Sequence, residues 1–281
     1  MVTLTDCQLD QATAWLDHGL RRACAAIAAT KRPVRLLLSG GVDSGLLASY
    51  LWETGADVSA LTLRTPWGDE VKGATRTAQH VGLPLEVVDL TAEQIVAAIP
   101  RCMQLMQSAD AESVAVHLLV TAAFELAARD GADLITGLGS DLLNASSELG
   151  MSGVSADLIA RIGDVSASGL MVTDEFTEGS RLRHPYWEPD VMHLQLAVPS
   201  ALKTVEGVDK FYVRQLAGDR LPPATASGKK IAIHEGSGLV AGVEATLGET
   251  LSSYCARTWN AMAEEVILVG NAGDLTEGAS L

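Results

Sequence analysis

The stretch LLLSGGVDSGLL, residues 36–47, is an apolar run that ends in two glycines, an aspartate and a serine. The run VRLLLS, residues 34–39, is too short and too apolar for a surface helix and favours a buried parallel strand, and we expect a helix from about residue 44 to 53. A strand that turns tightly into a helix gathers backbone N–H groups at the helix N-terminus, where anions bind. The stretch therefore predicts a phosphate-binding loop.

The residue types in this loop indicate which phosphate group it binds. Gly40 and Gly41 form the turn, and Ser39 and Ser44 can add hydroxyl donors. Asp43 would repel phosphate unless a divalent cation lay between them. The lysine of GxxxxGK[ST] loops is missing, so we expect magnesium pyrophosphate and not γ-phosphoryl chemistry. The plainer alternative is a glycine turn whose aspartate only caps the next helix.

Strand-like and helix-like segments alternate over the first half of the chain. The patterns predict strands at 58–63, 85–90 and 132–137, and helices at 8–30, around 71–81, from 92 and around 113–129. This alternation is typical of an α/β domain with a parallel sheet. We expect an N-terminal helix (1–33), a nucleotide-binding core (34–144) and a mostly helical substrate or lid region packed on it (145–281).

Composition restricts the class of protein. The 281 residues are 48% hydrophobic and contain no uncharged apolar stretch of 18 residues, and the N-terminus lacks a signal-like pattern, so we expect a cytoplasmic protein with no membrane partner. The formal net charge of −15 disfavours nucleic acid as a partner. Four cysteines without a CxxC pattern are expected to be ordinary thiols: Cys7, Cys24, Cys102 and Cys255.

SGGVDS, residues 39–44, resembles the SGGxDS signature of the PP-loop ATP pyrophosphatases, which cleave ATP between its α- and β-phosphates and pass AMP to a substrate. The resemblance implies a PP-loop (HUP-like) α/β fold, a five-stranded parallel sheet flanked by helices with a C-terminal helical lobe, and the cofactors ATP and Mg²⁺. Three further stretches are similar to the asparagine synthetase and β-lactam synthetase branch. They are ADLITGLGSDLLN (132–144), HPYWEPDVMHLQLAVPSALK (184–203) and VDKFYVRQLAGDRLPPATASGKKIAIHEGSG (208–238).

The resemblance also implies roles for individual residues. Asp43 and Asp141 would hold magnesium, and Lys230 would stabilise negative charge during adenylation and amide formation, with Lys229 as its close competitor. Leu63 would offer backbone groups to adenine, since strand ends line the crevice of such sheets. The remaining implied nucleotide contacts are Ser39, Gly40, Gly41, Ser44 and Gly137. Lys203, Lys210 and Arg214 match basic positions of the branch, but ion pairs within the helical region would explain them as well.

The sequence departs from the branch at three places. Leu138 stands where asparagine synthetases have Glu and β-lactam synthetases have a catalytic Tyr, and a leucine cannot relay a proton. The nucleophile then needs little activation, or the base lies elsewhere, with Asp174, Glu175, Glu178 and His184 as candidates. Ala226, Ser227 and Gly228 replace the arginine of the RxK signature. The chain begins MVTLTD without a glutaminase domain, so we expect no glutamine hydrolysis by this chain.

The leading functional prediction is an ATP-dependent amide or lactam synthetase of specialised metabolism, acting on a small-molecule carboxylate and an amine. A homodimer, or a separate partner protein that supplies substrate or ammonia, stays open. A second hypothesis is a PP-loop tRNA-modifying enzyme, which the net charge and the lack of paired cysteines disfavour. A third is a degenerate nucleotide-binding subunit, which Leu138 keeps open.

Overall fold

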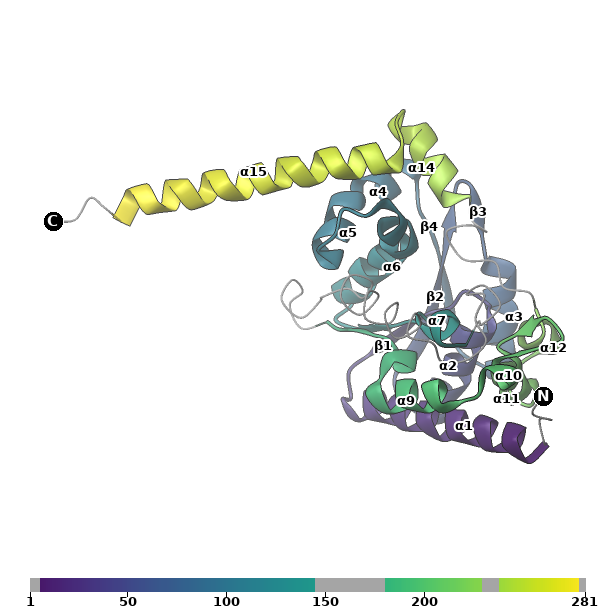
Figure 1. Ribbon diagram of the computed structural model, residues 1–281. Coiled ribbons are helices and arrows are strands. Elements are labelled where there is room, and N and C mark those ends of the chain that lie inside the picture. The colour runs from purple at the N-terminus through teal and green to yellow at the C-terminus, as the bar shows by residue number, and fades with distance from the viewer. Residues whose placement is uncertain (1–5, 145–179, 229–237, 278–281) are drawn as a thin grey trace.

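A computed structural model describes residues 6–144, 180–228 and 238–277 of the chain. Helices flank a central parallel sheet, which confirms the expected α/β class (Figure 1). The strands are β1 (Val34–Leu37), β2 (Val58–Thr65), β3 (Gly68–Asp69), β4 (Leu85–Asp89), β5 (Asp133–Ile135), β6 (Leu182–Arg183), β7 (Thr204–Val205) and β8 (Val208–Asp209). The helices before residue 145 are α1 (Asp6–Ala29), α2 (Val42–Glu53), α3 (Val71–Val81), α4 (Ala92–Ala97), α5 (Ile99–Met106), α6 (Ala111–Arg129) and α7 (Ser140–Asn144). Those after residue 179 are η1 (Pro185–Trp187), α9 (Pro189–Ala197), α10 (Ser200–Lys203), α11 (Phe211–Gly218), α12 (Pro223–Ala226), α14 (Leu239–Leu247) and α15 (Leu251–Glu277).

Five parallel strands lie in the order β4, β2, β1, β5, β6, as the resemblance implied. The short β3 adds an antiparallel hairpin at the end of β2. The fifth parallel strand, β6, comes from beyond residue 144 and pairs with β5 through Leu134–Leu182 and Ile135–Arg183. From β1 the chain builds outward to β2 and β4 on one side and to β5 and β6 on the other. The strand order therefore switches at β1, and ligands of open α/β sheets bind at such a point.

Successive residues of β1 belong to two hydrophobic clusters, one on each face of the sheet. Leu36 belongs to the cluster shared with α1, α2 and α11, whereas Leu37 belongs to the cluster shared with α5 and α6. The helices beyond residue 179 divide between these faces, because α9 and α11 contact α1, while α14 contacts α4 and α15 contacts α5 (Figure 1). α9 and α11 thus lie on the α1 side of the sheet, while α14 and the start of α15 lie on the side of α4 and α5, and the rest of α15 extends away from the sheet (Figure 1).

The amphipathic pattern near the N-terminus forms α1. Its apolar residues recur every three or four positions and face the first cluster: Ala12, Leu16, Leu20, Ala23 and Ile27, all buried. Each fully buried leucine or isoleucine contributes roughly 2 kcal/mol of transfer free energy. α1 therefore forms part of the core on that face.

α6 is the one helix in the described ranges that is long and apolar enough, by length and composition, to cross a membrane. In this structure it packs against α5, β1 and β5, and Leu118, Leu119 and Phe124 lie inside the second cluster. Asp110 caps its N-terminus by accepting a hydrogen bond from the Ser113 N–H at 2.8 Å. These contacts are those of a core helix.

Candidate active site

The predicted phosphate loop lies where β1 ends and α2 begins. Gly40 has φ of 77°, a left-handed conformation that favours glycine. The hydroxyl oxygens of Ser39 and Ser44 are 3.0 Å apart, and the Gly41 N–H donates to Ser39 Oγ at 3.4 Å. Gly41 is the N-cap of α2 and provides no side-chain cap for its first N–H groups. The loop therefore combines hydroxyls with a helix N-terminus, as a phosphate site requires.

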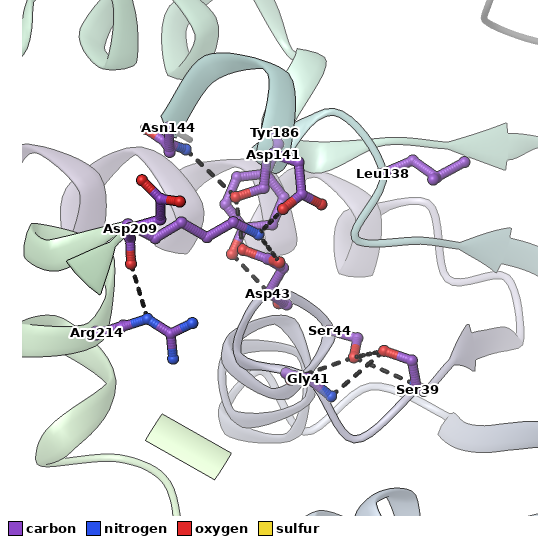
Figure 2. A network of polar contacts seen from close by, with 12 residues as sticks. Ser39, Gly41, Asp43, Ser44, Leu138, Asp141, Asn144, Tyr186, Asp209 and Arg214 are labelled. Carbon is purple, nitrogen blue, oxygen red and sulfur yellow. Dashed lines mark hydrogen bonds and ion pairs between the residues drawn. The ribbon is translucent and has the colours of Figure 1, made fainter. Parts of the chain in front are cut away.

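Asp43 and Asp141, both labelled in Figure 2, meet at one cation, the ammonium of Lys210. Asp43 lies in the first turn of α2, Asp141 in α7, and Lys210 directly before α11. Lys210 Nζ is 2.6 Å from Asp43 Oδ2 and also pairs with Asp141 Oδ1. The structure thus brings together two aspartates that are far apart in sequence, and adds a lysine.

Two neighbours fix the orientation of Asp43. Ser140 Oγ donates to Asp43 Oδ1 at 2.6 Å, and the Tyr186 hydroxyl donates to the Asp43 main-chain oxygen at 3.2 Å. Burial, reinforced by the charge of Asp43, raises the pKa of the Tyr186 hydroxyl well above its ordinary value, so this group stays a donor. Both neighbours belong to the stretches that carry the family resemblance.

A buried network of hydrogen bonds between amide and hydroxyl groups supports α7. Asn144 Nδ2 donates to Gln195 Oε1 at 2.6 Å, and the Tyr212 hydroxyl donates to Asn144 Oδ1. Gln195 in turn donates to the Tyr186 main-chain oxygen at 3.0 Å. This network joins α7, α9 and α11, so it holds the segments that carry Asp141, Tyr186 and Lys210 in one arrangement.

Lys210 is held by a local turn. The hairpin of β7 and β8 ends at Lys210, whose φ of 58° is in the left-handed region. Arg214 Nε donates to the Asp209 carbonyl oxygen at 2.8 Å, and Thr204 Oγ1 donates to Asp209 Oδ1 at 2.6 Å (Figure 2 labels Asp209 and Arg214). The sequence showed Lys210 and Arg214 only as family-like basic positions. In the structure Lys210 pairs with the distant Asp43 and Asp141, whereas Arg214 bonds main-chain oxygens that are close to it in the sequence.

Leu63, on β2, and Gly137, in the turn after β5, were both predicted to contact the nucleotide. The pairing of β1 with β2 ends at Leu37 and Leu61, so Leu63 continues past the end of β1, as expected for a residue at the crevice edge. A Cβ on Gly137 would lie 3.0 Å from the Ser44 nitrogen, so the turn after β5 approaches the start of α2 closely. The adenine and phosphate roles of these two residues stay predictions.

His184 was a candidate base, and its surroundings favour a structural role. Thr136 Oγ1 accepts from the Leu138 N–H at 3.3 Å and lies 2.7 Å from His184 Nδ1. The Thr136 hydroxyl thus joins the Leu138 main chain to the imidazole ring and holds His184 in place. Burial, with a smaller effect of His117, lowers the pKa of His184 to about 3. Such a group is a weak base, and Leu138 itself packs against the second hydrophobic cluster.

Several predicted residues lie outside the described part of the chain. These are Lys229 and Lys230 of the tail motif, and Asp174, Glu175 and Glu178 among the candidate bases. The described chain before them is held at Ala226 and Gly228, because Arg214 Nη1 donates to both carbonyl oxygens, each at 2.9 Å. The assignment of Lys230 stays a prediction.

The oxygen ligands fit a magnesium ion. Asp43 Oδ2 and Asp141 Oδ1 converge on one point occupied by a cationic group, and carboxylate oxygens are what Mg²⁺ prefers. Among the described residues no group of three or more His, Cys, Asp or Glu side chains gathers into a metal site. Magnesium commonly binds through one or two carboxylates, with substrate phosphates and water completing its shell. Two aspartates beside a phosphate loop match that pattern.

The buried cysteines have no part in this site. Cys24, Cys102 and Cys255 are free thiols. Burial raises the pKa of Cys24 and of Cys102 to about 12 and that of Cys255 to about 11. They are therefore inert thiols, as the sequence predicted.

Comparisons with known proteins agree with the motifs. The asparagine synthase family profile matches residues 16–160 and 176–268. The carboxyethyl-arginine beta-lactam-synthase of Streptomyces clavuligerus is 25% identical over 240 residues, which are 81% of this chain and 45% of that protein. A candidate glutamine-hydrolyzing asparagine synthetase of Methanocaldococcus jannaschii is 23% identical over 208 residues, 70% of this chain and 38% of that protein.

This chain thus spans less than half the length of these two curated relatives. Among solved structures, the NMN synthetase from Francisella tularensis covers 86% of this chain and 82% of its own, with 15% identity and a TM-score of 0.45. The family profile matches well over half of the chain and includes the loop, both aspartates and Lys210. The chain therefore belongs to the asparagine synthase family.

Proposed function

We propose that this chain is an ATP-dependent synthetase that activates a carboxylate as an acyl adenylate and joins it to an amine, as an AMP-forming carbon–nitrogen ligase. The observation that carries the proposal is the convergence of Asp43, from the SGGVDS loop, with Asp141, from the TGLGSD turn, at the switch point of the sheet. The family match and the similarity to a β-lactam synthetase support the same reaction class.

The proposed chemistry has two steps. A carboxylate oxygen of the substrate attacks the α-phosphorus of ATP, the bond to the β-phosphate oxygen breaks, and pyrophosphate leaves. The amine then attacks the acyl carbon, loses a proton, and AMP leaves with the former carboxylate oxygen. Activation is needed because a carboxylate is a poor electrophile, and the site gains rate by holding the adenylate and the amine together.

The chain's own residues hold and stabilise charge in this scheme. Ser39, Ser44 and the N-terminus of α2 would bind the phosphates. Asp43 and Asp141 would hold magnesium, which would supply positive charge beside the pyrophosphate. Lys230 would stabilise the charge that develops on the α-phosphate and the acyl oxygen.

The substrates are proposed by class alone. The chain would use a small-molecule carboxylate and an amine, with the amine supplied free, by the same substrate in a ring closure, or by a partner protein. The beta-lactam-synthase among the relatives makes ring closure in specialised metabolism, such as antibiotic biosynthesis, a reasonable first direction. We propose no nucleic-acid substrate, because the net charge of −15 opposes it.

Exchange of labelled pyrophosphate into ATP, run with a panel of carboxylic acids, tests the proposal. We expect exchange that depends on one class of acid and on magnesium, and that is lost in Asp141→Ala. Exchange without any acid would indicate a different adenylate acceptor. Tight ATP binding with no exchange for any acid would instead support a nucleotide-binding subunit without catalysis, the alternative that Leu138 keeps open.

A further inference from the structure

We propose that the Lys210 ammonium and magnesium compete for the same two carboxylates, Asp43 and Asp141, so that Lys210 is a built-in cation which the metal must displace. This inference rests on the proposed function, which places magnesium at these two residues. It adds a role for Lys210 that the sequence motifs did not assign.

The contacts of Lys210 are those of a cation site. Its Nζ lies 2.6 Å from Asp43 Oδ2 and also pairs with Asp141 Oδ1, so one ammonium bridges carboxylates from α2 and α7. Magnesium binds carboxylate oxygens at roughly 2.1 Å. A metal ion on these same oxygens would fall within a few ångströms of Nζ, where two positive charges repel strongly in a buried site. The two cations therefore exclude one another at these positions.

The conformation and position of Lys210 are energetically unfavourable, and its ion pairs offset this. Its φ of 58° is unfavourable for a residue with a Cβ, and a cation at a helix N-terminus faces the positive end of the helix dipole. Its side chain is also only 2% exposed. A residue held in such a conformation is a candidate for function, because the surrounding structure must maintain it.

The exposure of the three side chains shows from which side a metal can reach the pair. Asp43 is 8% exposed and Lys210 2%, whereas Asp141 is 34% exposed. Water therefore reaches the pair at Asp141. A hydrated metal would meet Asp141 first and would replace Lys210 at Asp43 afterwards.

A consequence for binding order follows from the charges. Two carboxylates balance one ammonium with one negative charge left over, which is too little for a divalent ion and the lysine together. A pyrophosphate anion beside the loop adds negative charge for the displaced Lys210 ammonium to face once the metal has taken the two carboxylates. Metal alone should thus bind weakly to the natural protein, and metal with pyrophosphate should bind well.

Binding of Mn²⁺, followed by the electron paramagnetic resonance signal of the free ion, tests the competition without turnover. In the absence of nucleotide, Lys210→Met should bind Mn²⁺ about tenfold or more tightly than the natural protein, since a nearby unit charge is removed. The matched control is Lys203→Met, which removes another buried lysine, 4% exposed, for which the described chain shows no ion pair. That control should leave Mn²⁺ affinity unchanged.

The arms of the experiment separate this inference from the proposed function. Adding Asp141→Asn to Lys210→Met should abolish the gain in affinity. If Lys210→Met binds Mn²⁺ no more tightly than the natural protein, while both bind it with inorganic pyrophosphate, the metal site stands and the competition is wrong. If neither protein binds Mn²⁺ even with inorganic pyrophosphate, the magnesium assignment of the proposed function fails.

Thermal unfolding tests the same inference if Lys210→Met is too unstable for binding measurements. Without a divalent ion, two carboxylates are left without their ammonium, and we expect a melting temperature about 10 °C lower. Saturating Mg²⁺ should restore most of that loss in Lys210→Met and raise the natural protein little. A variant that stays unfolded in Mg²⁺ would show that the lysine does something that a divalent ion cannot replace, and would overturn the inference.

Discussion

At the residue scale, Asp43 joins the parts of the site. One carboxylate oxygen accepts from Ser140 and the other from Lys210, each at 2.6 Å, and its main-chain oxygen accepts from Tyr186. Its side chain is 8% exposed, compared with 34% for Asp141. The two aspartates therefore differ. Asp43 contributes to folding as well as to the proposed chemistry, while the role proposed for Asp141 lies mainly in that chemistry.

We predict that Asp141→Ala abolishes acid-dependent AMP formation while costing only about 1 kcal/mol of unfolding free energy, because its pair with Lys210 is partly exposed. Asp43→Ala should abolish the same activity and cost about 3 kcal/mol, since it breaks a buried ion pair. Urea denaturation and nucleotide chromatography measure the two effects. Near-normal turnover in Asp141→Ala would contradict its assignment as a metal ligand.

Lys230 can be tested by turnover even though it lies outside the described residues. If its ammonium meets charge that develops only during adenylation or amine attack, Lys230→Ala should lower kcat by about two to three orders of magnitude and change nucleotide binding little. Lys230→Arg should restore only part of the rate, because its planar group places charge differently. Lys229→Ala is the matched control and should be close to normal. The reverse pattern would move the role to Lys229.

The lowered pKa of His184 leads us to predict that the stability of the fold depends on pH. Burial lowers its pKa from 6.5 to about 3, so as the pH falls below 6.5 the unfolded chain takes up this proton first and the folded state loses stability. Replacing it by asparagine keeps an acceptor for Thr136 and removes the titration. Between pH 6 and 4, the unfolding free energy of His184→Asn should fall less steeply than that of the natural protein, by up to about 1.4 kcal/mol per pH unit.

Urea denaturation at a series of pH values makes this comparison. Equal slopes for His184→Asn and the natural protein would show that His184 is not held neutral by its surroundings.

At the element scale, the phosphate loop is fixed by the start of α3. A Cβ on Gly40 would lie 2.3 Å from the Gly73 carbonyl carbon, so the two backbones touch where α3 begins. This contact places the loop against α3 on one side, and the close approach of Gly137 to Ser44 fixes it on the other. The loop is therefore set by packing between elements and not by its own sequence alone.

Gly40→Ala should cost about 3 to 5 kcal/mol of unfolding free energy, because it combines a left-handed residue with a backbone clash. Gly55→Ala is a close control, since Gly55 has φ of 66° and nothing within 4 Å of its added Cβ. It should cost only about 1 to 2 kcal/mol. Urea denaturation compares the two variants. Equal costs would show that Gly73 does not constrain the loop.

Comparison of the observed elements with the sequence shows which patterns were sufficient to predict a strand or a helix. Runs of apolar residues predicted β1, β2, β4 and β5, and helical periodicity predicted α1, α3 and α6, because each buries a patterned face. Other elements, among them β6 and α5, gave no such signal. β6 has two residues and is a strand only because β5 lies beside it, and α5 begins with a proline in its first turn. Short elements of this kind depend on tertiary contacts.

At the scale of the whole molecule, the site brings together residues from distant parts of the chain. Asp43 and Lys210 are 167 positions apart, and their contact requires the sheet, the packing of α11 on α1, and the β7–β8 hairpin together. The motifs singled out Asp43, because a carboxylate in a phosphate loop calls for a cation, and Asp141, because its stretch resembles the family pattern. The bridging by Lys210 was not predictable, since it depends on a left-handed residue after a two-residue strand.

The central claim is that a carboxylate attacks the α-phosphate of ATP, and the fate of oxygen tests it most directly. A carboxylic acid that supports pyrophosphate exchange is labelled with ¹⁸O in its carboxylate, converted to product with an amine, and the AMP is analysed by mass spectrometry. The proposed mechanism predicts AMP and pyrophosphate as products, with one labelled oxygen in the phosphate of AMP. Unlabelled AMP, or ADP and phosphate in its place, would contradict it.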